Sequence, residues 1–298
     1  MNGILIVDKP TDFTSFDVVA VIRKTLHERK TGHTGTLDPL ATGVLPILLG
    51  SATKAQILLP DSDKEYRAEF KLGITTDTLD ITGKVFSSCT SHITTEQLEE
   101  VMPYFRGKIM QKPPMYSAVS KDGVRLYELA RKGIVVEREA RPVTVDRLEL
   151  VDFDEKNQCG TLLINCSKGT YIRVICDDIG SRLGCGCVMT SLRRTKACGF
   201  GIDSALPLEK IREFAEDGSI DRYIRPVDSI FLCYKSVSIT ENQTVRFNNG
   251  GGLMLSRLRG LSDIDDGTLY RVYSDKKVFL GLGVVNSEKQ ELSIKKRF

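Results

Sequence analysis

The period of the apolar positions changes several times along the chain, which predicts a mixture of strands and helices. Residues 3–7 form a short apolar run that is typical of a buried strand. Over residues 16–29 the apolar side chains recur every three or four positions, and Thr14 and Ser15 offer a cap for the amphipathic helix that this spacing predicts. Residues 64–72 alternate between polar and apolar, as in a strand with one buried face.

Prolines affect the structure that is predicted for three further segments in the first half of the chain. Residues 44–49 are apolar enough for another buried strand, but Pro46 inside this run indicates a bulge. Residues 95–102 predict a helix that stops before Pro103. Residues 108–121 contain prolines and show no period, so we expect an exposed insertion there.

The second half of the chain predicts two paired strands, a helix and a compact C-terminal unit. The strands cover residues 143–153 and 160–166, and the helix covers residues 171–183 and ends at Gly184. The pattern changes near residue 228, and short strands punctuated by turns follow. Residues 269–274 and 278–285 predict a hairpin within a small barrel that carries a basic tail.

The amino-acid composition is typical of a soluble globular protein. The chain has 298 residues, of which 41% are hydrophobic and 27% charged, as in soluble globular proteins. It lacks an apolar run long enough for a transmembrane helix, and its first residues do not resemble a signal peptide. The eight cysteines are therefore expected to be thiols in the cytoplasm, and the absence of C-x-x-C argues against zinc.

Charge is concentrated in one segment. The net charge is only +3, but residues 105–133 contain seven basic and two acidic side chains, interleaved with prolines and tyrosines. Such a segment suits a partner lined with phosphates. A solvated charged surface would have a similar composition, so charge alone leaves both interpretations open.

The strongest candidate for chemistry is Asp38. Gly32 and Gly35 loosen the backbone ahead of it, and Pro39 disfavours helical geometry at Asp38 itself. A carboxylate presented from such a loop can act as a nucleophile or base, although Asp-Pro is also common in plain turns.

The run of fifteen residues from Gly32 to Pro46 closely resembles the catalytic motif of the bacterial tRNA pseudouridine synthase B (TruB) family. Members of that family convert the T-loop uridine at position 55 of tRNA to pseudouridine. Residues 64–68 and 167–173 resemble two further motifs of the family, and the resemblance extends over nearly the whole chain. One departure is Cys185-Gly186-Cys187, where members usually carry a small or alanine-like residue.

The resemblance implies an α+β fold, with a central, mostly antiparallel mixed sheet flanked by helices and a small C-terminal PUA-like β-barrel. Residues 1–228 would form the catalytic domain, with an RNA-gripping insertion at residues 105–133. Residues 229–298 would form the PUA-like, RNA-binding domain. The match of this last part is looser than that of the motifs.

The resemblance also assigns roles to single residues. Asp38 would be the catalytic carboxylate, Arg173 would pair with it, and Tyr66 would stack on the flipped base and act as general base or acid. A desolvated aspartate needs such a cation to stay ionised, and a flipped base needs an aromatic face. The other implied contacts with the substrate are Tyr171, the apolar wall Leu192, His33 beside the target nucleotide, and Lys9 as a structural or phosphate contact.

These roles have simpler structural alternatives. Arg173 could form an ordinary ion pair on a helix surface, Tyr66 could be a core residue and Leu192 could serve packing alone.

The implied reaction needs neither a metal nor another cofactor. The implied partner is the T-arm stem-loop of tRNA, with no membrane and no obligate protein partner, for a cytoplasmic monomer. Two other functions stay open: a tRNA-folding chaperone without catalysis, and a carboxylate-based nucleosidase. The nucleosidase would need a second carboxylate, for which Asp80, Asp177 and Asp178 are available without a matching motif.

Overall fold

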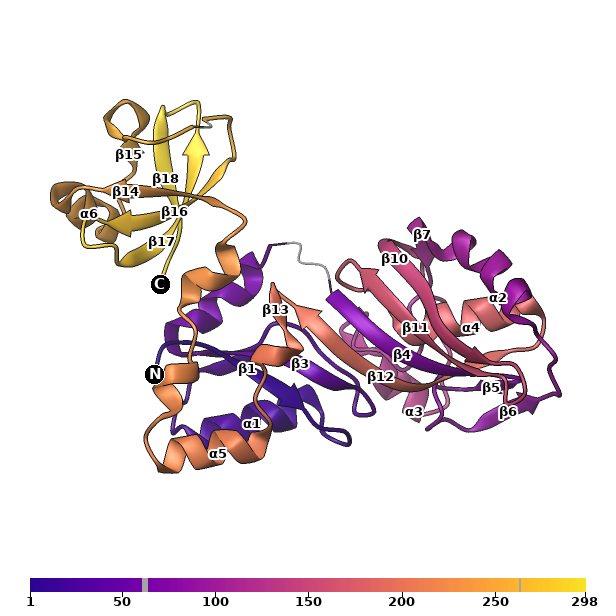
Figure 1. The fold of residues 1–298 in the computed structure, drawn as a ribbon. Helices are drawn as coiled ribbons and strands as arrows, with labels where there is room; N and C mark the ends of the chain where they lie inside the picture. The colour runs from indigo at the N-terminus through magenta and orange to yellow at the C-terminus, as the bar shows by residue number, and fades with distance from the viewer. Residues whose placement is uncertain (61–63, 263) are drawn as a thin grey trace.

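The computed structural model describes residues 1–60, 64–262 and 264–298, and one large sheet spans most of them (Figure 1). This nine-stranded sheet has the order β1-β3-β12-β4-β11-β10-β7, with β2 paired to β3 and β13 paired to β12. All neighbours are antiparallel except β3 and β12, which are parallel. The strands are β1 (Gly3–Lys9), β2 (Thr31–His33), β3 (Thr42–Leu49), β4 (Lys64–Leu72), β7 (Gly107–Gln111), β10 (Arg141–Asp154), β11 (Cys159–Cys166), β12 (Cys187–Ala197) and β13 (Phe200–Gly201).

Helices cover the two ends of this sheet. At the end that holds the N-terminus, α1 (Ser15–Thr25) and α5 (Leu208–Glu216) pack their apolar faces on β1 and β3. At the other end, α2 (Thr95–Val101) and α4 (Ile172–Leu183) pack on β4, β11 and β12. The remaining elements of this part are η1 (Gly50–Leu58), β5 (Ile74–Thr76), β6 (Val85–Ser88), η2 (Met102–Phe105), β8 (Ser120–Lys121), β9 (Val124–Arg125), α3 (Leu126–Arg131), η3 (Ile202–Ser204), η4 (Ile220–Tyr223) and η5 (Val227–Phe231).

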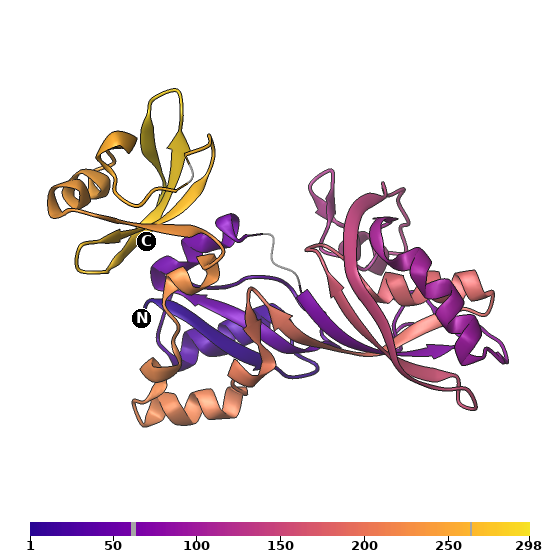
Figure 2. The ribbon, with the colours of Figure 1, turned by 45° about the horizontal axis from the view of Figure 1, so that its top comes forward.

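The C-terminal residues form a separate five-stranded sheet with the order β14-β16-β17-β18-β15. Both views place it beside the half that holds the N-terminus and away from β7 (Figures 1 and 2). Its elements are β14 (Lys235–Ile239), α6 (Glu241–Asn248), β15 (Leu253–Met254), η6 (Leu255–Arg257), β16 (Leu269–Ser274), β17 (Phe279–Asn286) and β18 (Glu291–Arg297).

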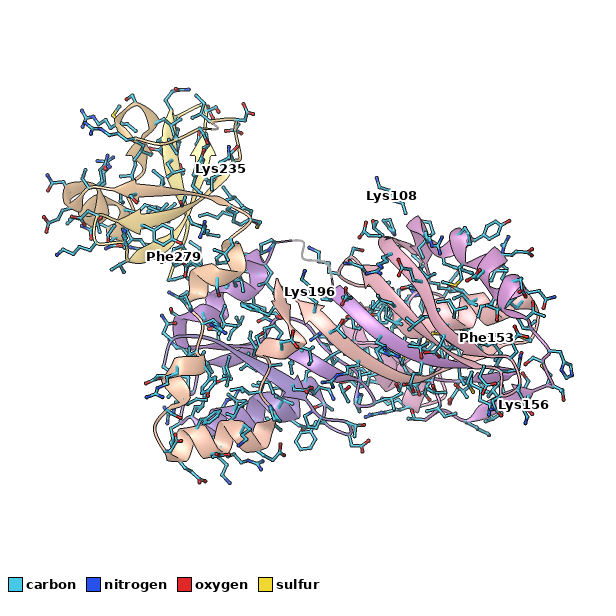
Figure 3. All side chains as sticks on the ribbon, viewed as in Figure 1. Lys108, Phe153, Lys156, Lys196, Lys235 and Phe279 are labelled. Carbon is cyan, nitrogen blue, oxygen red and sulfur yellow. The ribbon has the colours of Figure 1, made fainter. Side chains whose placement is uncertain are left out.

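An aromatic cluster joins this unit to the large sheet. Phe231 packs against Phe279 and Phe298, within a core that also contains Ile4 and Leu48 of the large sheet. Figure 3 labels Phe279 at this junction. The C-terminal sheet is therefore held against the rest of the protein by buried apolar contacts.

Most predicted elements are confirmed. The strand predicted over residues 64–72 has the same bounds as β4, and the two predicted pairs are β10–β11 and β16–β17. The helix predicted over residues 171–183 is α4, which ends at Gly184 in the left-handed region with φ 75°. The helix predicted over residues 16–29 is shorter, because the chain leaves helical geometry after Thr25 and His27 has φ 51°.

The predicted bulge at Pro46 is wrong. Strands β1 and β3 keep a continuous register, with Ile6 opposite Pro46. The carbonyl of Pro46 accepts a hydrogen bond from the backbone N–H of Thr34 (3.1 Å), just beyond the end of β2. The N–H and C=O of a residue in an antiparallel strand point to the same side. The position at which Pro46 lacks an N–H therefore faces the end of β2, and the backbone hydrogen bonds between β1 and β3 are not interrupted.

The insertion predicted for residues 108–121 is exposed at Lys108, Met110 and Lys112, but its first part is a strand of the large sheet rather than an irregular segment. Residues Gly107–Gln111 form β7, which pairs with β10 at the edge of the large sheet. Pro113, Pro114 and Ser117 beyond it are buried. Of the five residues of β7 only Gln111 is buried, so neither face of this strand required apolar side chains at alternate positions and the sequence shows no clear period.

Within the described residues, no helix is long and apolar enough to cross a membrane. All eight cysteines belong to the described residues, and each is a free thiol.

Candidate active site

Local hydrogen bonds fix the loop that carries Asp38. The Ser15 hydroxyl, at the start of α1, accepts a hydrogen bond from the backbone N–H of Leu37 (2.8 Å). The carbonyl of Asp38 accepts one from Ala41 (3.0 Å), which closes a turn around Pro39. The Asp38 side chain retains 38% exposure, so its carboxylate is presented at the surface of a cavity.

Arg194, on β12, holds the backbone around the same loop by hydrogen bonds from its buried side chain. Its side chain is fully buried, and Nε and Nη2 donate to the carbonyls of Val44 (2.7 Å) and Gly35 (3.1 Å). The strand of Arg194 also passes very close to Gly43, where an added Cβ would lie 2.2 Å from the Arg194 carbonyl oxygen. With φ at +100°, Gly43 is required by both space and backbone conformation.

Arg173, in the first turn of α4, lies between two carboxylates. Its Nη2 is 3.3 Å from Asp38 Oδ2, and its Nη1 is 3.6 Å from Asp80 Oδ2. The same guanidinium donates to the carbonyls of Tyr116 (2.5 Å) and Thr78 (3.3 Å). The side chain is only 5% exposed, which rules out the alternative of an ion pair on the helix surface.

Asp80 was not predicted as part of this network. It is 5% exposed, and its Oδ1 accepts hydrogen bonds from the Thr82 N–H (3.0 Å), the Thr82 hydroxyl (2.6 Å) and the Thr78 hydroxyl (2.9 Å). Threonines two residues to either side of an aspartate were a usable signal, since such hydroxyls commonly fix a buried carboxylate. Nothing in the sequence connects Asp80 with Arg173.

A cavity of about 260 Å³ opens beside Asp38. Five of the predicted site residues are part of its lining, and Met189, Lys64, Ser117 and Thr170 lie among the others. Its size is near the lower end of the range for ligand pockets, which suits one small planar ligand. The five predicted residues are Asp38, Tyr66, Tyr171, Arg173 and Leu192.

Two of the predicted residues lie elsewhere. Lys9 is fully buried, and its Nζ donates to the carbonyls of Pro10 (2.7 Å) and Pro39 (3.2 Å). That position fits a structural contact beneath the Asp38 loop and leaves no access for a phosphate. His33, at the end of β2, is half-buried and is not among the described residues that line the cavity, and its Nδ1 atom is buried.

Burial dominates the electrostatics of the site. It raises the pKa of Asp38, Asp80 raises it further, and the Arg173 guanidinium opposes both effects. Burial likewise raises the pKa of the Tyr66 phenol, so this side chain is neutral at ordinary pH. Burial lowers the pKa of Lys9 to about 8 and also lowers the pKa of His33.

Gln111 is a further residue that the sequence did not single out. Its amide makes two hydrogen bonds to the backbone of Tyr171, as donor from Nε2 to the carbonyl (3.0 Å) and as acceptor at Oε1 from the N–H (2.7 Å). Tyr171 caps α4 without a side-chain hydrogen bond of its own. Gln111 therefore connects the end of β7 to the first turn of α4, where Arg173 lies.

The arrangement is that of a carboxylate enzyme site, with an acid, its cationic partner and an aromatic wall around one small cavity. Among the described residues, no three His, Cys, Asp or Glu side chains group as a metal site would require.

Comparison with known proteins identifies the family. Residues 23–172 match the model of the N-terminal domain of TruB family pseudouridylate synthases, and residues 173–232 match that of the C-terminal domain of tRNA pseudouridylate synthase B. The chain belongs to the TruB family of pseudouridylate synthases.

Individual relatives cover nearly the full length. The tRNA pseudouridine synthase B of Clostridium tetani is 44% identical over 289 residues, 97% of each chain. That of Mannheimia succiniciproducens is 39% identical over 291 residues, 97% of this chain and 93% of the relative.

Solved structures share the fold. A chain in the crystal structure of a Cbf5-Nop10-Gar1 complex is 26% identical, with a TM-score of 0.76 over 99% of this chain and 84% of that one. A chain in the structure of an H/ACA RNP bound to a substrate RNA containing 2'-deoxyuridine is 24% identical, with a TM-score of 0.75 over the same shares.

Proposed function

We propose that this protein isomerises the T-loop uridine at position 55 of tRNA to pseudouridine, with Asp38 as the catalytic group and no cofactor. The observation that carries the proposal is the ion pair of Asp38 with Arg173 at the wall of a cavity that Tyr66 and Leu192 also line. Membership of the TruB family and the names of its relatives supply the reaction class.

The cavity can hold one extruded pyrimidine. A uridine inside a folded RNA must leave its stack before its glycosidic bond can be reached. Tyr66 and Leu192 provide a neutral aromatic face and an apolar face for the ring, while Tyr171 lines the same cavity near the first turn of α4. This packing replaces the stacking that the base loses on extrusion.

Asp38 has to be ionised to attack, either at the pyrimidine ring or at the sugar carbon. Its burial works against ionisation, and Arg173 supplies the compensating positive charge at 3.3 Å. Because Arg173 is itself fixed by two carbonyls and by Asp80, the pair is organised before the substrate binds. The attack leads to cleavage of the bond between the sugar and the ring nitrogen, and the detached base rotates in the cavity and rejoins the same sugar carbon through a ring carbon. That ring carbon then loses its proton and the freed ring nitrogen takes one up, so the RNA keeps its composition.

The chain is proposed to divide into a catalytic domain and an RNA-binding domain. Residues 1–228 are proposed as the catalytic domain, in which residues 105–133, with their excess of basic side chains, grip the T-arm. Residues 229–298, with their five-stranded sheet and basic tail, are proposed as a PUA-like, RNA-binding domain. His33, half-buried at the end of β2, is proposed to contact the RNA beside the target. The enzyme would act as a cytoplasmic monomer.

Incubation with an unmodified tRNA transcript tests this proposal against its alternatives. We expect one uridine in the T loop to become pseudouridine with no change in RNA mass. Release of free uracil would instead show a nucleosidase. Faster tRNA folding without any pseudouridine, equal in wild type and Asp38→Asn, would show a chaperone alone.

A further inference from the structure

Cys89 and Cys185 meet at the base of the β5–β6 hairpin, although they are far apart in the sequence. The Cys89 thiol lies 3.2 Å from the carbonyl oxygen of Cys185 and donates to it. Cys89 is exposed and Cys185 is half-buried, so solvent reaches both positions. Cys185 belongs to the Cys185-Gly186-Cys187 segment that follows α4.

Backbone hydrogen bonds hold these segments in register. The N–H of Cys89 donates to the carbonyl of Gly73 (2.9 Å), and the N–H of Gly73 donates to the carbonyl of Gly186 (3.0 Å). The approach is close, because an added Cβ at Gly186 would lie 2.6 Å from Thr75 Cγ2. A small ladder of backbone bonds therefore keeps the segments that carry Cys89 and Cys185 next to each other.

The other thiols nearby are shielded. Cys176 and Cys187 are each 1% exposed, and burial raises the pKa of Cys176 to about 12. The pKa of Cys185 is raised first by burial, and the neighbouring Cys89 raises it further, as expected for two thiols in proximity. An oxidant in solution thus reaches Cys89 first, with Cys185 as the adjacent second thiol.

We propose that Cys89 and Cys185 are a reversible disulfide site, oxidised by a low-molecular-weight disulfide such as glutathione disulfide. The Cys89 thiolate attacks one sulfur of the glutathione disulfide, which forms a mixed disulfide and releases one glutathione thiolate. The Cys185 thiolate then attacks the Cys89 sulfur and releases the second glutathione. The protein loses two hydrogens, and one glutathione disulfide is reduced to two glutathiones.

The cross-link would act on the part of the fold that holds Arg173. The β5–β6 hairpin carries Asp80 and the carbonyl of Thr78, both of which contact the guanidinium. Cys185 follows Gly184, the C-terminal cap of the helix that begins just before Arg173. A disulfide would tie the base of the hairpin to the end of this helix, and local opening of the hairpin would become rarer. The disulfide itself does not depend on the proposed reaction.

Glutathione disulfide titration of the full-length protein at mildly alkaline pH, read by intact mass and peptide mapping without reduction, tests the site. We expect a species lighter by two hydrogens, a Cys89–Cys185 cross-linked peptide, slower amide exchange in residues 74–88 and an upward shift in Tm. Reducing agent should reverse all four. The matched control is Cys233→Ser, which removes an exposed thiol from the C-terminal unit and should leave the cross-link unchanged.

Two single variants distinguish the role of the Cys89 thiol from that of the Cys185 thiol. In Cys185→Ala, we expect oxidation to stop at a glutathione adduct on Cys89. In Cys89→Ser, we expect the internal cross-link to be lost. The proposal is overturned if the wild-type protein accumulates a stable glutathione adduct on Cys89 while Cys185 remains open to alkylation. It is equally overturned if the disulfide joins other cysteines.

Discussion

Arg173 Nη2 lies 3.3 Å from Asp38 Oδ2, and the other terminal nitrogen of the same guanidinium lies 3.6 Å from Asp80 Oδ2. One cation therefore serves two carboxylates, of which only Asp38 lines the cavity. The forked guanidinium explains why this position requires an arginine. A lysine has a single side-chain nitrogen, which cannot contact both carboxylates and both backbone carbonyls at once.

Arg173→Lys should lower the rate of pseudouridine formation by about 10²–10³ while tRNA binding changes little, because a forked, charge-assisted contact is lost. Single-turnover kinetics with a tRNA transcript, beside a filter-binding measurement, separates the two effects. Arg182→Lys, on the exposed side of the same helix, is the control and should behave as wild type. Equal rates for both variants would contradict the role given to Arg173.

Asp80→Asn should move the acid limb of the pH–rate profile to lower pH. Asp80 raises the pKa of Asp38, so its neutral replacement leaves Asp38 ionised down to a lower pH. The plateau rate should fall as well, because Arg173 loses one of its fixed partners. Single-turnover rates measured over a pH series check this prediction. Asp177→Asn is the control, because Asp177 also lies on α4 but does not contribute to the pKa shift of Asp38. An acid limb that stays in place, or moves upward, would disprove this coupling.

Asp38→Asn should unfold at a higher temperature than wild type near neutral pH. The folded-state pKa of Asp38 is raised above the ordinary value, so the folded protein binds this proton more tightly than the unfolded chain does. The contribution of Asp38 to stability is thus present at acid pH and is lost as pH rises through the raised pKa. Thermal unfolding of both proteins over a pH series should show the difference in Tm growing from acid to neutral pH. A constant difference would refute the argument.

Gln111→Ala should destabilise the protein by about 1 kcal/mol, because the half-buried N–H of Tyr171 loses its acceptor, whereas the Tyr171 carbonyl keeps the N–H groups of Val174 and Ile175 as donors. We also expect a lower rate, since the first turn of α4 positions Arg173. Urea denaturation measures the stability, and Gln56→Ala, at an exposed position, is the control. No loss of stability relative to Gln56→Ala would show that these bonds do not hold α4.

The sequence predicted local features better than contacts between distant segments. The alternation of residues 64–72 identified β4, since the period of a half-buried strand is a local property. Strand β7 was missed because neither of its faces is continuously buried, so its side chains do not alternate between apolar and polar. Five of the seven predicted site residues line the cavity, whereas Lys9 is a buried support of the loop.

Asp80 and Gln111 were missed for a different reason. Their partners, Arg173 and Tyr171, are distant in the sequence, and the folded chain alone brings them together. The threonines on either side of Asp80 indicate a fixed carboxylate, but no local pattern reveals which distant residue a buried polar side chain contacts.

The most direct test of the account maps pseudouridine at single-nucleotide resolution in a tRNA transcript after incubation with wild type or Asp38→Asn. Binding of the transcript is measured in parallel. We expect one modified T-loop uridine with wild type, and none with Asp38→Asn despite retained binding. Pseudouridine at that uridine from the Asp38→Asn protein would contradict it.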